Sequence, residues 1–394
     1  MSTVAFHTLG CKVNHYESEA MMDLFKKRGY QIVDFQENAD IYIINSCTVT
    51  NAAARKSRQF ARRAKRRNQA ATVVLVGCYA QVSPEEVKDV EEIDYILGTD
   101  NKIEIVDLIE QSNRENVFLN QIDDYQSLTE YEDLKVDQMR ETTRGYVKIE
   151  EGCNQFCSYC IIPYARGPVR SREISSVIDE VKHLVSHGIK EIILTGIHLG
   201  AYGFDWNQET ALMDLIKKLI NINDLKRLRL SSIEVSEITD SMIDYLASEP
   251  KLCPHLHLPL QSGSDKILKA MQRPYTKAEF KQVVDKLKTK VPDIALTTDV
   301  MVGFPGETES DFTRTYDFIK NIGFSRLHVF PYSKREGTPA AEMKHQLPGD
   351  IKKERSKKLR ELNQKLMLNY QKQFLGQIKD VIIEDKRDYE TNFL

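Results

Sequence analysis

The chain has 394 residues, with 55 lysines and arginines against 58 aspartates and glutamates, so its formal net charge is −3. This length suffices for two or more domains with buried cores. The charge balance excludes a uniformly basic nucleic-acid binder, but not a local basic face. The start of the chain has no basic-then-apolar leader pattern, and no apolar run approaches the roughly 20 residues that span a bilayer. We therefore expect a cytoplasmic protein. Its 7 cysteines, an odd number, favour metal or redox chemistry over a disulfide framework.

Short apolar strands alternate with helices through roughly the first 110 residues. The expected strands cover residues 4–8, 41–45, 72–77 and 94–97, and the expected helices cover 16–27, 52–68, 84–90 and 103–110. Such an alternation indicates a parallel sheet that is covered by helices on both faces. We therefore expect an α/β fold in which residues 1–120 form a flavodoxin-like domain.

Three cysteines each follow one of these expected strands. Cys11 comes after the first strand, Cys47 after the second and Cys78 after the third. In an open parallel sheet the functional crevice lies beyond the carboxyl ends of the strands, so these three thiols are delivered to one edge. The alternative is three independent buried thiols, which are common in cores. Core cysteines fall within strands or helices, however, so the pattern favours a metal site on this N-terminal triplet.

Residues 121–140 have a different character, with many acidic residues and little helical or strand periodicity. We interpret this segment as an acidic linker between two domains.

From residue 144 the alternation resumes and repeats about six times. The expected strands cover residues 145–150, 191–195, 227–230, 255–258, 294–300 and 326–330, and the helices between them include 174–187, 212–220, 264–271, 277–289 and 310–322. This pattern predicts a partial (β/α)6 TIM-type barrel over residues 141–375, with functional loops at the carboxyl ends of its strands. Six units rather than eight would leave one side of the barrel open to a large substrate.

Three further cysteines follow the first expected strand of this barrel. Cys153, Cys157 and Cys160 have the spacing C-x3-C-x2-C, directly after Gly152. They supply three ligands where a closed four-iron cluster takes four cysteines, so one iron is left open for a small molecule. Structural zinc would need a fourth protein ligand, and no second pair of ligands follows. The spacing of this loop triplet resembles that of the radical S-adenosylmethionine (SAM) enzymes, with zinc or unrelated thiols as the alternatives.

Longer motifs extend this resemblance. They are Ile161-Ile-Pro-Tyr-Ala-Arg166-Gly-Pro-Val-Arg170-Ser-Arg172, Leu194-Thr-Gly-Ile, Leu230-Ser-Ser-Ile-Glu234, His257-Leu-Pro-Leu-Gln-Ser-Gly-Ser264 and Asp299-Val-Met-Val-Gly-Phe-Pro-Gly-Glu307-Thr. Together with both cysteine triplets they resemble the radical-SAM methylthiotransferases, from about residue 3 to residue 376. The resemblance implies SAM and two [4Fe-4S] clusters, one on each triplet. It also implies a one-electron reductant, flavodoxin- or ferredoxin-like, and a sulfur donor.

The first cysteine motif indicates the subtype. Leu9-Gly-Cys11-Lys-Val-Asn14-His-Tyr-Glu17-Ser18 is similar to the MtaB type, which converts N6-threonylcarbamoyladenosine at position 37 of tRNA to its 2-methylthio derivative. That reaction replaces the C2 hydrogen of adenine, which is not acidic, so a radical must abstract it and a cofactor must supply the radical. The alternatives are an enzyme that acts on isopentenyladenosine or on a ribosomal protein aspartate, and a non-catalytic zinc-bearing RNA-binding protein.

The C-terminus departs from the family pattern. The resemblance implies a small terminal β-barrel RNA-binding (TRAM-like) domain, but only residues 376–394 remain for it, with a strand-like stretch at Val381–Glu384. We expect a truncated or reduced domain there.

Residues beside the loop triplet and at the strand ends are candidates for binding SAM. Tyr159 lies between two cysteines, where the family places an aromatic residue against the adenine of SAM; the alternative is a packing tyrosine. Thr195 and Gly196 end the second barrel strand, and a glycine there lets the backbone approach the SAM amino group. Ser232, Glu234 and Gln261 end the next strands, and we expect them to bond the methionyl and ribose groups unless they merely cap helices. Cys253 is expected to be structural.

One expected helix is strongly basic. Eight cations and no acid lie between residues 55 and 67, just after Cys47. We expect Arg62, Arg63, Arg66 and Arg67 to contact RNA phosphates, because this excess exceeds what a solvated helix face needs. The anticodon loop is the expected partner, since splayed loop bases are the usual targets of RNA recognition.

Overall fold

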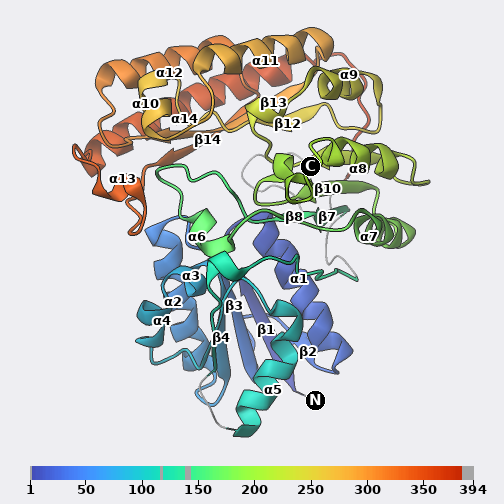
Figure 1. Cartoon of the computed structure of the whole chain (residues 1–394), viewed down its shortest axis with the longest axis vertical. Coiled ribbons are helices and arrows are strands. Elements are labelled where there is room, and N and C mark those ends of the chain that lie inside the picture. Colours follow the sequence, from blue (N-terminus) through green and yellow to red (C-terminus); the bar gives the residue numbers. More distant parts are fainter. Residues whose placement is uncertain (1, 116–118, 138–142, 384–394) are drawn as a thin grey trace.

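The protein consists of two α/β units packed against each other, as seen in a computed structural model that describes residues 2–115, 119–137 and 143–383. In Figure 1 the N-terminal unit lies below and the second unit lies above it, so the two sets of strands meet along one interface. No helix within the described ranges is long and apolar enough to cross a membrane.

The N-terminal unit is built on one parallel sheet. Its strands are β1 (Thr3–Thr8), β2 (Gln31–Val33), β3 (Ile41–Ser46), β4 (Thr72–Gly77), β5 (Tyr95–Leu97) and β6 (Leu119–Gln121). Their order in the sheet is β2-β1-β3-β4-β5-β6, and every neighbouring pair is parallel. The first five strands thus have the flavodoxin order, as predicted. The three-residue strands β2 and β6 were not predicted, because they are too short to show a pattern.

Helices cover both faces of this sheet. They are α1 (Lys12–Lys27), α2 (Asn51–Arg67), α3 (Cys78–Val82), α4 (Pro84–Lys88) and α5 (Ile105–Glu115). Strand β3 is buried along its whole length, and alternate residues face opposite ways: Tyr42 and Ile44 pack with α2, α3 and α4, whereas Ile41 and Ile43 pack with α1 and α5. Because helices cover both faces of the sheet, side chains on both faces of a strand are buried. This explains why the strands are continuous apolar runs in the sequence.

The segment predicted as an acidic linker does run between the two units, but it is packed rather than solvated. Leu134 and Val136 are buried in the core beneath α1 and α5. Asp133 forms an ion pair with Arg172 at 2.6 Å, and Glu132 lies 3.9 Å from Lys102. Its acidic residues therefore act as partners for buried cations. Residues 138–140 of the predicted linker lie outside the described residues.

The second unit contains six parallel strands in two adjoining sheets. They are β7 (Arg144–Lys148), β10 (Glu191–Thr195), β11 (Arg227–Leu230), β12 (His255–His257), β13 (Ala295–Val302) and β14 (Arg326–Pro331). One sheet has the order β11-β10-β7 and the other β12-β13-β14, and isolated bridges such as Ser232 to His257 join them. A short antiparallel pair, β8 (Glu150–Glu151) and β9 (Arg170–Ser171), flanks the first sheet. All six predicted strands are present.

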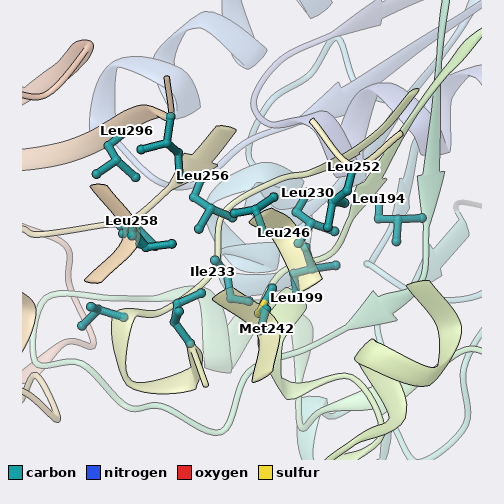
Figure 2. Packing of buried hydrophobic residues seen from close by; sticks show 14 of the residues in the cluster. Leu194, Leu199, Leu230, Ile233, Met242, Leu246, Leu252, Leu256, Leu258 and Leu296 are labelled. Atoms are coloured by element: carbon teal, nitrogen blue, oxygen red, sulfur yellow. The ribbon is translucent and has the colours of Figure 1, made fainter. Parts of the chain in front are cut away.

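The helices of this unit are α6 (Ile162–Arg166), α7 (Ile174–Ser186), α8 (Ala211–Ile220), α9 (Asp240–Ser248), α10 (Asp265–Ala270), α11 (Lys277–Lys290), α12 (Glu309–Ile322), α13 (Pro339–Glu342) and α14 (Gly349–Lys372). Helix α6 lies at the interface with the N-terminal unit, whereas α7, α8, α9, α11 and α12 pack on the outer side of the strands. Figure 2 shows strand residues such as Leu194, Leu230 and Leu256 against Met242 and Leu246 of α9, a helix that was not predicted. These leucines occupy alternate strand positions, so the residues between them face the barrel interior.

The interior face is mostly polar, although apolar residues such as Ile193, Met301 and Phe330 also lie on it. It carries Arg144, Glu191, Arg229, His255, His257, Thr297, Asp299, Met301, His328 and Phe330. Along β13 these positions are half-buried and alternate with buried ones. An eight-stranded barrel is filled by layers of apolar side chains, so this partial barrel instead retains an accessible interior.

A buried polar network joins the two units. The guanidinium of Arg166 has no solvent exposure and donates to Glu17 at 2.6 Å, to Asn14 at 2.7 Å and to Glu151 at 3.0 Å. Burial alone would raise the pKa of Glu17, but Arg166, Lys102 and Lys148 hold it well below its usual range. Glu17 and Asn14 belong to α1, whereas Arg166 ends α6, so these bonds fix α1 against the barrel.

The strand predicted near the C-terminus is not found among the residues that the structure describes there. Residues 377–383 have no regular secondary structure, so the strand predicted at residues 381–384 is absent from its first three positions. Residues 384–394 of the predicted TRAM-like segment lie outside the described residues.

Candidate active site between two cysteine triplets

The N-terminal triplet meets at one edge of its sheet, as predicted. Cys11 caps α1 after β1, Cys47 follows β3, and Cys78 begins α3 after β4. Gly10 has a φ of +110°, and a Cβ there would lie 2.9 Å from the Cβ of Cys47, so only glycine fits this approach. Burial raises the pKa of Cys47, and raises that of Cys78 to about 12, and in both cases the nearby thiols add to the effect.

The loop triplet is held by backbone anchors. Gly152 has a φ of +85°, and a Cβ there would lie 1.9 Å from the carbonyl oxygen of Pro168. Further along, Ser158 donates its N–H to Met271 at 3.0 Å and its hydroxyl to Ala270 at 2.8 Å, which fixes the loop to the end of α10. Burial raises the pKa of Cys160 to about 12, and the thiols of Cys157 and Cys153 contribute, so these cysteines lie close together.

One short helix connects the two triplets. Helix α6 starts two residues after Cys160 and ends at Arg166, whose Nε donates to the Sγ of Cys78 at 3.1 Å. A residue that belongs to the barrel thus contacts the cysteine of the other unit. The two triplets are therefore held at a fixed spacing across the interface.

A cavity of about 200 Å³ opens between the two units beside this helix. Its lining comes from the turn after Cys47, the cysteine loop and the ends of β13 and β14: Val49, Thr50, Tyr159, Cys160, Ile161, Ile162, Gln261, Asp299, Met301, Phe330, Pro331, Tyr332 and Ser333. Val49 and Phe330 are 54% and 47% exposed, which is unusual for large apolar side chains. These two exposed apolar side chains lie beside the polar residues that line the same cavity. Such a combination suits a flat ligand with polar edges.

The predicted SAM residues have different surroundings. Tyr159 packs against the cluster that contains Met271 and Tyr332 and also lines the cavity, so it is a packing residue and its contact with SAM stays a prediction. Gln261 lines the same cavity. Thr195 is buried at the end of β10, and Ser232 is exposed after β11.

Glu234 and Gly196 differ from expectation. Glu234 is paired with Arg273, so its carboxylate is engaged by a protein cation. Beside Gly196 a Cβ would lie 2.6 Å from Oε2 of Glu150, so the space expected to be open for the SAM amino group holds a carboxylate.

Glu150 is a site residue that the sequence analysis missed. Its Oε2 accepts the backbone N–H of His198 at 2.7 Å, whereas its Oε1 is buried with no hydrogen-bond partner among the described residues. Burial raises the pKa of Glu150 to about 8, against the opposing effect of the His198 N–H. The available signal was its place at the end of a predicted strand, three residues before the first cysteine of the loop.

The four predicted RNA-binding arginines separate into two pairs. Arg62 lies 3.6 Å from Glu92, and the Nε of Arg66 donates to the carbonyl of Arg62. Arg63 instead lies over the ring of Phe60, and Arg67 over that of Phe35, with 5.1 and 5.9 Å to the ring centroids. All four occupy the last two turns of α2, about 16–24 Å along the helix from its start after Cys47.

Arg63 and Arg67 line a second, larger cavity of about 800 Å³ at the β2 edge of the sheet. Its other lining residues are Phe6, His7, Met22, Ile32, Val33, Asp34, Phe35, Gln36 and Phe60. The imidazole of His7 is stacked on Phe60 with 3.4 Å between centroids. Burial, followed by the charge of Arg63, lowers the pKa of His7 to about 4, so a neutral ring faces the guanidinium.

Comparisons with known proteins identify the family. Residues 3–98 match "Uncharacterized protein family UPF0004", and residues 147–319 match the "Radical SAM superfamily". Threonylcarbamoyladenosine tRNA methylthiotransferase MtaB of Bacillus subtilis is 47% identical over 385 residues, which cover 98% of this chain and 85% of that protein. The chain belongs to this methylthiotransferase family.

Other relatives place it within the family. MtaB of Aquifex aeolicus is 40% identical, with 99% of this chain and 95% of that protein covered. A tRNA-2-methylthio-N(6)-dimethylallyladenosine synthase of the same organism is 36% identical, with 97% and 88% covered. The MtaB relatives are thus more similar to this chain than that synthase is.

A solved structure supports the fold. The radical SAM methyltransferase TsrM of Kitasatospora setae, described with cobalamin and a [4Fe-4S] cluster bound, has a TM-score of 0.65 at 17% identity, with 86% of this chain and 77% of that chain covered. At this identity the likeness concerns the fold alone, and it agrees with the α/β class predicted from the sequence.

The donor sets of both triplets suit iron–sulfur clusters, because they consist of thiols alone. Structural zinc draws all its ligands onto a single centre, whereas cysteines that ligate a four-iron cluster each bind a different iron. Three thiols per site, two of them buried in the N-terminal triplet, match the second case.

The approach of Gly152 to Pro168 gives a test of how the loop is held. Gly152→Ala should lower the free energy of unfolding by at least about 3 kcal/mol, because it adds a steric overlap to the cost of a positive φ. Gly188→Ala is the matched control: its φ is +98° but nothing lies within 4 Å of the added Cβ. That control should cost only about 1–2 kcal/mol. Urea unfolding of both variants measures the difference, and equal losses would contradict this account.

Proposed function

We propose that this protein is a methylthiotransferase that converts N6-threonylcarbamoyladenosine at position 37 of tRNA to 2-methylthio-N6-threonylcarbamoyladenosine. Membership of the family, with 40–47% identity to three MtaB enzymes, supports this activity. The observation that carries it is the arrangement of the site: two cysteine triplets lie either side of one interface, and a cavity beside them is lined from both units. A single-cluster enzyme or a zinc-bearing binding protein would not need this pairing.

As a radical SAM enzyme the protein uses SAM and an iron–sulfur cluster. We assign that cluster to the loop triplet, with one iron open for SAM, and a second [4Fe-4S] cluster to the N-terminal triplet, where it would hold the incoming sulfur. When bound, SAM and the loop cluster supply the radical that removes the C2 hydrogen of adenine. The electron comes from a flavodoxin- or ferredoxin-like donor.

The protein's own residues would bind and orient the reactants. The unpartnered Oε1 of Glu150 is placed to accept a hydrogen bond from the ammonium of SAM, which would satisfy a buried acceptor. Tyr159 and Met301 would exclude water from the cavity, and Val49 and Phe330 would contact the faces of the target base. A base held there lies between the turn of Cys47 and the loop of Cys160.

The barrel interior favours a substrate that carries a carboxylate. Lys12 directly follows Cys11 and has no carboxylate within salt-bridge distance among the described residues. Partial burial, and then the charges of Arg229 and Arg144 of the barrel, lower its pKa, so we infer that its ammonium faces these strands. The threonylcarbamoyl group ends in a carboxylate and the isopentenyl group does not, so these cations favour the first substrate over the second.

We propose that the second cavity binds tRNA at a place separate from the cavity that holds the target base. Its two arginines would hold phosphates, while Phe60 and the stacked His7 offer an aromatic surface to an unstacked base of the anticodon arm. Arg62 is already paired with Glu92, so we expect it to contribute less to tRNA binding.

Separate roles for the triplets give the first test of the function. Cys153→Ala should abolish both SAM cleavage and product, because it removes a ligand from the loop cluster. Cys11→Ala should retain SAM cleavage and lose methylthio insertion. Anaerobically reconstituted enzyme, incubated with threonylcarbamoylated tRNA, is assayed for 5′-deoxyadenosine and, by nucleoside mass spectrometry, for the 2-methylthio product. Absence of product from the wild-type chain would refute the function, and equal loss of 5′-deoxyadenosine in both variants would refute the separate roles.

Lys12 allows a test of substrate choice that does not depend on bound clusters. Binding is compared for one tRNA with and without its threonylcarbamoyl group. Lys12→Gln should reduce the preference for the modified tRNA about tenfold, because a charged hydrogen bond is lost, and leave the affinity for unmodified tRNA unchanged. Lys27→Gln, at the other end of α1, is the matched control. An unaltered preference in Lys12→Gln would exclude this lysine from recognition.

The two arginine pairs give a test of RNA contact. Arg63→Gln with Arg67→Gln should weaken tRNA binding at all sequences and reduce the slope of log K against log salt by about one unit per lost phosphate contact. Arg62→Gln with Arg66→Gln should reduce it less, because Arg62 already faces Glu92. The slope is measured by titrating tRNA at several salt concentrations. Equal slopes in the wild type and the first double variant would show that the second cavity does not contact RNA.

A further inference from the structure

A single turn of the barrel supports two of the three cysteines of the loop triplet. This turn, η5 (Val235–Glu237), follows β11, and Glu234 caps it in a reciprocal box with Glu237. The backbone N–H of Glu234 donates to Oε2 of Glu237 at 3.1 Å. Both carboxylates therefore have fixed positions, three residues apart, and each of them holds a basic side chain that points at a different cysteine.

The first branch runs from Glu234 through Arg273 to Cys157. Arg273 pairs with Glu234 through Nη2, and its Nη1 donates to the Sγ of Cys157 at 3.3 Å. The Arg273 side chain is only 4% exposed, and its Nε donates to the hydroxyl of Tyr275 at 3.1 Å. The guanidinium is thus held by three partners, and one of its amino groups donates to the sulfur of Cys157.

The second branch runs from Glu237 through His198 to Cys153. The Nε2 of His198 lies 2.5 Å from Oε1 of Glu237, and its Nδ1 lies 3.7 Å from the Sγ of Cys153. One ring nitrogen thus lies beside the carboxylate of Glu237 and the other beside the sulfur of Cys153, so the ring bridges the turn and the cysteine loop. The Glu237 carboxylate lies directly against Gly200, where an added Cβ would come within 1.8 Å of its Oε2, so a side chain at residue 200 would displace it.

Cys160 has no such partner among the described side chains. No hydrogen bond from a described side chain reaches its thiol, although the cysteine lines the cavity. Two ligands of the triplet therefore lie against the side chains of Arg273 and His198, and the third has no such contact. This asymmetry shows that the two branches are not a general feature of the loop.

We propose that the turn formed by Glu234 and Glu237 sets the reduction potential of the cluster on the loop triplet, by holding the guanidinium of Arg273 and the imidazole ring of His198 against its ligand sulfurs. The inference rests on the proposed function for the presence of that cluster. Reduction adds one electron from the flavodoxin- or ferredoxin-like donor and breaks no bond, so the ligand sulfurs become more negative. Donors and positive charge beside them stabilise the reduced state and raise the potential.

The experiment is a redox titration of the reconstituted full chain, followed by electron paramagnetic resonance without tRNA. The loop cluster is identified as the one whose signal changes when SAM is added. At a fixed potential near the midpoint, His198→Gln should lower the ratio of reduced to oxidised cluster about tenfold, which corresponds to about 59 mV for a one-electron couple. Arg273→Gln should act in the same direction, and Arg273→Lys should restore more than half of the loss by restoring the charge. His187→Gln, an exposed histidine on the same unit, is the matched control and should leave the ratio unchanged.

The outcomes separate this inference from the function itself. Unchanged midpoints in both His198→Gln and Arg273→Gln would overturn it. So would loss of cluster iron from His198→Gln and Arg273→Lys, because the branches would then be needed for assembly instead of for the potential. A wild-type chain with no SAM-responsive cluster would refute the proposed function instead.

Discussion

The arrangement of this protein depends on one buried cation. Arg166 has no solvent exposure, so its charge must be neutralised within the protein, and it is held by Glu17, Glu151 and Asn14. A buried charge that loses its partner costs about 3–5 kcal/mol, so these contacts are retained together or not at all. Because Glu17 and Asn14 come from α1 while Arg166 comes from α6, the requirement to neutralise one guanidinium also orients two domains.

A second constraint is the division of the barrel strands into two faces. Their outward residues are mainly leucines and valines that pack with helices, and Figure 2 shows the leucines among them, whereas their inward residues are mostly polar and include histidines, arginines and an aspartate. A polar inner face cannot be buried without partners, so it stays hydrated until a ligand or the N-terminal unit covers it. Tyr146 of β7 already packs on the core beneath α1, which closes one side. The remaining opening lies by Val49 and Phe330, where both units meet.

Much of this fold was accessible from the sequence, because it follows from local periodicity. Strand β3 is a buried apolar run, and α2 presents Ala54, Ala61 and Ala64 to the sheet at helical spacing. The cysteine positions were predictable for the same reason, since each follows a strand. Short elements were not: β2 and β6 have three residues each, which is too few to establish a period. Helix α9, with 9 residues, was missed as well.

Contacts between distant residues explain what the sequence could not predict about the site. Glu234 reads as a free acid at a strand end, but its partner Arg273 is 39 positions away in the chain. The carboxylate of Glu150 fills the space at Gly196 only because β8 leaves β7 at that point, which no local pattern encodes. Likewise the eight cations of α2 look equivalent in sequence, and only folding brings Glu86, Glu92 and Asp94 against three of them.

The brevity of α6 restricts how this chain can change over evolutionary time. Five residues separate the cysteine loop from the guanidinium that reaches the other unit. Adding or deleting one residue there would rotate the end of the helix by about 100° and direct the arginine away from Cys78. The fold can tolerate single substitutions in this stretch. It cannot tolerate a change of length, because no single further mutation would restore both the ion pair of Arg166 and the direction of its side chain. Surface loops of the barrel are free to lengthen or shorten, whereas this segment must keep its number of residues for as long as the two cysteine sets work together.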